Sequence, residues 1–175
     1  MKSLSMLSAR FDAAALRPPA RLPLPPSPDP RWAQLSTECR AAPQEPLRVA
    51  KLPHWALEPA ALHAWLRELD ADLPLERASA LGRMGLKLRA KLQDLGWGSA
   101  ATAIWDCGFL GEAALPALAQ FRPRRPTVIV LDPMPQPHVD TALQTLVRNA
   151  PQFARPVRVW VPPQSAPPEP TDPLK

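Results

Sequence analysis

PTVIVLDPMPQPHVDTALQTLVRNAPQFARPVRVWV, residues 126–161, is the stretch that decides the fold. Residues 126–131 are uncharged and rich in β-branched side chains, which is typical of a strand buried on both faces. Residues 138–149 carry apolar side chains at helical spacing. Residues 157–161 alternate valine with other side chains, which is the period of a strand. The stretch therefore predicts a strand, a helix and a second strand.

The same alternation extends upstream. Residues 102–105 (TAIW) predict another short strand, and residues 111–121 predict the helix that follows it. Strand and helix in alternation indicate consecutive right-handed βαβ units. Residues 47–52 (LRVAKL) add one more short strand. The predicted fold class is α/β, with a small parallel sheet of about three to four strands; the alternative is an all-helical domain with a two-stranded accessory.

An N-terminal helical pair is predicted between residues 52 and 102. Residues 59–71 place their large apolar side chains on one helical face. Residues 75–95 repeat apolar side chains at steps of three and four, and we expect this stripe to face the core: Leu81, Met84, Leu88, Leu92 and Leu95. Gly82 and Gly85 each cost about 1 kcal/mol relative to alanine inside a helix. Either the helix begins after them, or another element approaches its backbone closely.

Prolines mark both ends of the chain. Of the 26 prolines, many fall within residues 17–30 and 162–175, where they favour an extended polyproline II backbone. We divide the chain into a proline-rich, largely disordered N-terminal arm (residues 1–45), a single α/β domain (residues 46–161) and a disordered tail (residues 162–175). Residues 17–30 are interpreted as a stiff spacer, with a docking peptide for an SH3-like or WW-like groove as the alternative.

The N-terminus and the apolar runs of the chain indicate where in the cell the protein is expected, and the net charge indicates what kind of surface it has. No apolar run approaches the roughly 20 residues that a membrane-spanning helix needs. Residues 1–22 lack the uninterrupted apolar segment of a secretory signal, because Arg10 and Asp12 break it. We expect a cytoplasmic protein, with an organelle transit peptide as the alternative. The formal charge of +5 leaves room for a local basic surface.

A basic segment lies within the second helix. LGRMGLKLRAKLQDLG, residues 81–96, resembles the GXXG loop and following helix of a KH RNA-binding module, in which the loop clamps the nucleotide backbone. The resemblance implies RNA binding through the loop and four cations: Arg83, Lys87, Arg89 and Lys91. A KH module does not continue into two βαβ crossovers, so nucleic-acid binding is our second hypothesis.

Acids follow two of the predicted strands, Asp106 after residues 102–105 and Asp132 after residues 126–131. Ligands in parallel sheets bind outside the carboxyl ends of strands, so a small-ligand or enzymatic site there is our third hypothesis. Cys107 with His138 would supply a thiolate nucleophile. A GxxxxGK[ST] phosphate loop is missing from the sequence, which excludes a P-loop nucleotidase. We predict neither a metal nor a cofactor.

The aromatic set is unusual, with six tryptophans and no tyrosine. Trp32 and Trp55 stand beside proline-rich or extended segments, and Trp160 takes the outward phase of the last strand. Exposed tryptophans are enriched among the anchors of protein interfaces. No complete catalytic set accompanies them. The leading hypothesis is therefore a non-catalytic interaction protein or accessory subunit that docks on a protein partner through these tryptophans and the proline-rich arms.

Overall fold

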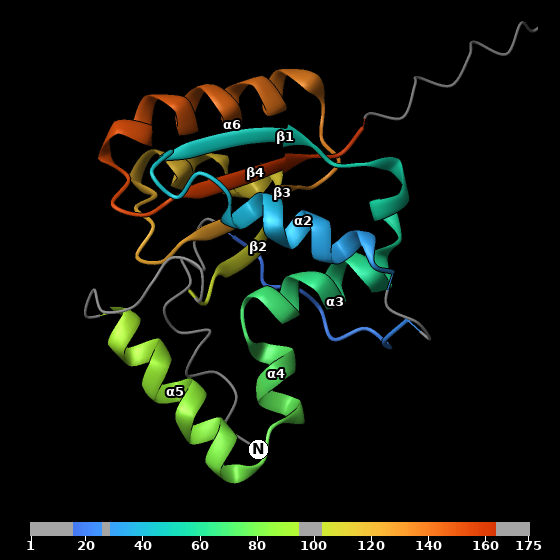
Figure 1. Ribbon diagram of the computed structural model, residues 1–175. Coiled ribbons are helices and arrows are strands. Elements are labelled where there is room, and N and C mark those ends of the chain that lie inside the picture. Colours follow the sequence, from blue (N-terminus) through green and yellow to red (C-terminus); the bar gives the residue numbers. More distant parts are fainter. Residues whose placement is uncertain (1–15, 26–28, 95–102, 164–175) are drawn as a thin grey trace, which may run out of the picture.

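Four parallel strands form one sheet in the computed structural model, which describes residues 16–25, 29–94 and 103–163 (Figure 1). The strands lie in the order β1-β4-β3-β2, and each neighbouring pair is parallel. This confirms the predicted α/β class and the small parallel sheet. Their bounds are β1 (Leu47–Lys51), β2 (Asp106–Leu110), β3 (Thr127–Leu131) and β4 (Val157–Val161).

Helices cover both faces of the sheet (Figure 1). One face carries α2 (Arg31–Arg40), η1 (His54–Leu57) and α3 (Pro59–Leu69); the other carries η3 (Glu112–Gln120), α6 (Gln136–Asn149) and η4 (Ala150–Gln152). The steps from β2 to β3 and from β3 to β4 each join neighbouring strands in the same direction, so their helices lie on one face. The connection from β1 to β2 passes two strands and lies on the other face. It continues into α4 (Asp72–Arg77) and α5 (Ala80–Asp94), which extend away from the sheet.

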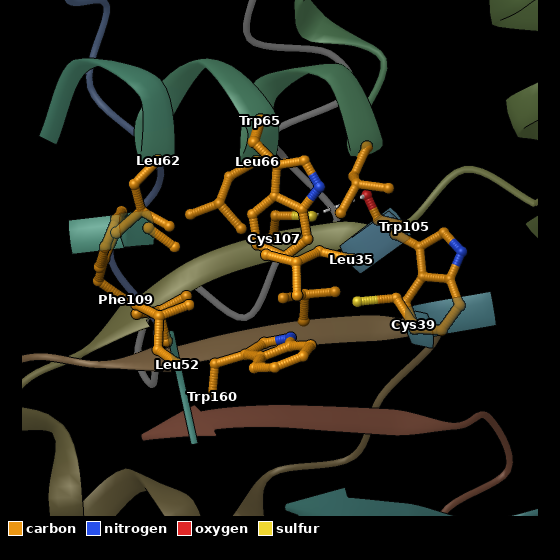
Figure 2. Packing of buried hydrophobic residues seen from close by; sticks show 14 residues of the cluster. Leu35, Cys39, Leu52, Leu62, Trp65, Leu66, Trp105, Cys107, Phe109 and Trp160 are labelled. Carbon is orange, nitrogen blue, oxygen red and sulfur yellow. Dashed lines mark hydrogen bonds between the residues drawn. The ribbon is translucent and has the colours of Figure 1, made fainter. Parts of the chain in front are cut away.

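Two apolar clusters hold the layers together. On β3, Val128 and Val130 face the cluster beneath α2 and α3, and Ile129 and Leu131 face the cluster beneath α6. All four side chains are essentially inaccessible to solvent, which explains why β3 reads as a continuous apolar run. In Figure 2, leucine and tryptophan side chains of α3 point toward the strands.

Of the strand predicted over residues 102–105, the structure describes residues 103–105, and these do not form a strand. The backbone of Ile104 is bound by the side chain of Gln93, which donates to the Ile104 carbonyl at 2.9 Å and accepts from its N–H at 2.8 Å. The Trp105 N–H donates to the carbonyl of Leu69 at 3.2 Å. These hydrogen bonds occupy backbone N–H and C=O groups that a strand would use to pair with its neighbour in the sheet. The strand instead begins at Asp106.

The single helix predicted over residues 75–95 is two helices. Between α4 and α5, Ala78 has an extended backbone with φ −77° and ψ 147°. The hydroxyl of Ser79 then accepts the N–H of Gly82 at 3.3 Å, which is how a serine caps the first turn of a helix. α5 therefore begins before both of its glycines.

Residues 29–45 belong to the folded domain. The prolines instead predict a disordered arm over this segment. Asp29 accepts the backbone N–H of Arg31 at 2.9 Å at the start of α2. Leu35 and Cys39 of this helix are buried in the first cluster. The domain boundary placed at residue 46 is therefore too late.

Residues 16–25, called the strap below, also lie on the domain. Arg17 forms an antiparallel bridge with Phe109, with two backbone hydrogen bonds of 2.8 Å. Leu16 is 2% exposed in the second cluster, and the N–H of Ala20 donates to Nδ1 of His63 at 2.8 Å. The interpretation of this segment as a spacer is wrong. Residues 1–15 and 164–175 lie outside the described residues.

Candidate functional site

Large apolar side chains line the outer face of α5. The exposed fractions are 79% for Leu81, 66% for Met84, 58% for Leu88 and 38% for Leu92. The prediction that this stripe faces the core is therefore wrong. We call these four residues the α5 stripe; their steps of three, four and four place them along one side of the helix. Leu95, the last member predicted, lies outside the described residues.

α5 contacts the domain through its opposite side. Ala90 is 1% exposed and forms a small cluster with Ala71 and Ile104. Gln93, one turn further along, is 8% exposed and binds the backbone of Ile104. A small side chain and an amide therefore make the inward contact, and the larger apolar side chains are left outside.

Cations border the α5 stripe. Four basic side chains of this helix are exposed: Arg83, Lys87, Arg89 and Lys91. At 3.6 residues per turn, Lys87 and Lys91 fall on one side of the stripe and Arg89 on the other. The sequence of α5 contains one acid, Asp94. The helix therefore presents an apolar strip with the positive charge of Lys87 and Lys91 along one margin.

The glycines of α5 do not form the loop that the KH resemblance implies. Gly82 and Gly85 both lie within the helix, which begins at Ala80. A Cβ added to Gly82 would lie 3.2 Å from the Cβ of Ala78, so a neighbour limits that position. At Gly85 an added Cβ would meet no described atom within 4 Å. Gly85 sits beside the stripe, and no packing within the described chain accounts for it.

The four residues of the strand-end hypothesis are not brought together. Asp132 follows β3 at the carboxyl edge of the sheet, whereas Asp106 is the first residue of β2, and a strand of this length spans about 16 Å. Cys107 faces the first cluster. His138 lies on α6, which covers the other face. The expectation that Asp106 ends a strand is wrong, and no common pocket follows.

Both cysteines are buried within the fold. Burial raises the pKa of Cys107 well above its ordinary value. Burial likewise raises the pKa of Cys39 to about 11. Both groups are thus neutral thiols near pH 7, and the thiolate is the reactive form. Within the described ranges, no three histidine, cysteine or acidic side chains gather as metal ligands would.

Asp132 instead holds the strap. Its carboxylate accepts two hydrogen bonds from Arg17, at 2.8 and 3.1 Å. The same guanidinium lies 4.9 Å from the ring centroid of Phe109. Desolvation, followed by the positive charge of Arg17, lowers the pKa of His63, which favours the neutral form that accepts the Ala20 N–H. The carboxyl end of the sheet is therefore occupied by the chain itself.

Four tryptophans pack against one another in a row, two of the three ring pairs being edge-to-face. The ring of Trp32 lies 5.0 Å from Trp55 and 5.4 Å from Trp65, and Trp65 lies 6.4 Å from Trp160. Trp160 is 5% exposed, so the expectation that it faces outward is wrong. Trp32 and Trp55 are half-buried. The row of rings runs from the surface to the sheet, and such aromatic pairs add to the stability of a core.

No family model matches the chain, and no curated protein or solved structure matches it. None of the helices in the described ranges is long and apolar enough to cross a bilayer. The surface chemistry of α5 is therefore the guide to function.

Proposed function

We propose that the protein is a non-catalytic interaction subunit of a larger assembly, and that it docks on a protein partner through the α5 stripe. The observation that carries this proposal is the exposure of Leu81, Met84 and Leu88 along one helical face. Burying apolar surface contributes about 25 cal/mol per Å². Contiguous exposed apolar side chains with a polar rim are typical of interaction sites.

The composition of the stripe suits a docking site. A few central side chains supply most of the binding energy of an interface, and methionine adapts its shape to the surface that it meets. The half-buried Trp32 and Trp55 are a second contact region in this proposal, as first suggested by the sequence. They lie on α2 and η1, apart from α5 along the chain.

The test is affinity capture from native extract with the full-length chain, comparing Leu88→Glu with Val147→Glu. Val147 is 59% exposed on α6, so both variants place one new acid on an exposed apolar position. We expect the wild-type chain and Val147→Glu to retain the same partners, and Leu88→Glu to lose about tenfold or more. Equal recovery by all three chains contradicts the proposal.

Nucleic-acid binding is the second candidate, favoured by the exposure of four cations on α5. Such binding depends on phosphate contacts and weakens steeply with salt. The double variant Lys87→Glu with Lys91→Glu should then lose RNA affinity, measured by filter binding at several salt concentrations. Unchanged RNA affinity rejects this candidate. Nuclease treatment of the extract separates it from protein docking.

A further inference from the structure

From the chemistry of the α5 stripe we infer that its occupant is an acidic amphipathic helix of the partner protein, lying along α5. This inference rests on the proposed function and specifies what docks there. α5 has 15 residues, or about 22 Å of helix. Its apolar side chains recur at steps of three and four, as they do where two helices pack side by side. α5 also lies away from the sheet (Figure 1), so a helix can run along its outer face.

Charge argues against a second copy of this chain as the occupant. α5 carries four exposed cations, and its sequence contains one acid. Two antiparallel copies of α5 packed face to face would bring Lys87 and Lys91 of both copies together along one margin. Charges beside the seam decide which helices pair, and like charges across an interface select against a partner. The matching helix therefore carries acids beside its apolar seam, on the side that meets Lys87 and Lys91.

Gly85 argues for a helix over a lipid surface. An added Cβ there would meet no described atom within 4 Å, so the glycine weakens α5 without serving the packing of its own chain. A missing Cβ allows another backbone or a fixed side chain to approach closely. A fluid bilayer surface has no fixed group to fill this position, whereas a packed helix does.

The test uses the full-length chain and two synthetic helical peptides of about 20 residues, long enough to span α5. Both have the same leucine seam; one has glutamates beside it, and the other has lysines. We expect the acidic peptide to bind at least about tenfold more tightly at physiological salt, measured by fluorescence anisotropy. Leu88→Glu should abolish this binding, and Val147→Glu should not alter it.

Gly85→Ala is the sharper variant. Because alanine favours a helix and an added Cβ meets nothing, the denaturation midpoint of the free chain should rise. Affinity for the acidic peptide should nevertheless fall about tenfold, because the Cβ occupies the place of close approach. If the variant is more stable and yet binds the peptide less tightly, its loss of affinity is not caused by unfolding.

Three results would overturn the inference: equal affinity for the two peptides, unchanged peptide affinity in Gly85→Ala, or binding to vesicles of phosphatidylcholine and phosphatidylglycerol with none to either peptide. The first two leave the proposed docking function standing if capture from extract still depends on Leu88. Loss of that dependence removes both proposals. The two failures are therefore distinguishable.

Discussion

Asp70 is a carboxyl group whose protonation differs between the folded and the unfolded chain. Burial at the end of α3 raises the pKa of its carboxyl group to about 8, against the opposing effect of the Asp72 N–H that donates to Oδ1 at 2.8 Å. The nearby charge of Asp72 raises the pKa further. The group is therefore largely protonated at pH 7 in the fold and ionised in the unfolded chain, which lowers stability at that pH.

Asp70→Asn should remove this penalty. A folded pKa raised above the ordinary 3.8 contributes stability that is complete below that value and is lost as the pH rises toward 8. The wild-type free energy of unfolding should thus fall relative to that of the variant between pH 4 and pH 8, as measured by chemical denaturation. Asp140→Asn, at an exposed position on α6, is the control. Parallel profiles for wild type and Asp70→Asn would show this account to be wrong.

Arg158 is a buried cation that binds the backbone carbonyls at the C-terminal end of α2. The residue is 2% exposed. Its guanidinium donates to four carbonyls in the last turn of α2 and just beyond it, those of Cys39, Ala41, Ala42 and Glu45. Arg158→Met leaves these acceptors without their donor and should cost about 3 kcal/mol. Arg158→Lys should cost less, because a lysine keeps three donors but lacks the planar fork. Equal unfolding midpoints for the two variants in denaturant would contradict this assignment.

At the scale of elements, the amide of Gln93 and the packing of Ala90 attach α5 to the domain. Gln93→Met removes both hydrogen bonds to Ile104 and should cost about 2 kcal/mol. Amide hydrogen exchange in residues 80–94 should accelerate more than in α6. Gln144→Met, on an exposed position of α6, should change neither quantity. Uniform exchange across both helices after Gln93→Met would mean that the amide does not anchor α5.

The strap offers a matched pair of leucines. Leu16 is 2% exposed and Leu24 is 45% exposed. Leu16→Ala should lower the free energy of unfolding by about 2 to 4 kcal/mol because it empties a buried site, whereas Leu24→Ala should have a small effect. Equal, small losses measured by thermal denaturation would restore the interpretation of this segment as a spacer.

The spacing of apolar residues correctly predicted those elements whose buried side chains are the apolar ones. β3 is apolar throughout and buried on both faces, and α3 and α6 each have one apolar face against the sheet. The prediction failed at residues 103–105, where the Gln93 side chain binds the backbone of Ile104. Such a contact joins distant residues and leaves no local pattern. The start of α2 did carry a signal, since an aspartate with a proline before a helical repeat marks an N-terminus.

The candidate site was found in part. The sequence pointed to four cations of a basic helical segment, Arg83, Lys87, Arg89 and Lys91, and all four are exposed. It placed the apolar side of that helix inward, because periodicity identifies an apolar face without showing what covers it. Ala90 and Gln93 make the inward contact. Alanine and glutamine are not residue types that mark the buried side of a helix in the sequence.

For the whole molecule, the order β1-β4-β3-β2 explains why α5 is exposed. The connection from β1 to β2 passes two strands and holds more helices than are needed to cover that face. α2 and α3 complete the first cluster, and α5 makes its own small contact beside it. The fold therefore has a stable three-layer core and one amphipathic helix whose apolar side remains outside.

Met84 allows the central claim to be tested directly. It is 66% exposed on α5, whereas Met134 packs partly buried against the second cluster and serves as an internal reference. Methionine oxidation follows exposure, so the measurement is the rate of peroxide oxidation at each residue in the isolated chain and in the assembly captured from extract. We expect oxidation of Met84 to slow about tenfold in the assembly and that of Met134 to stay constant. An unchanged rate at Met84 would contradict docking through α5.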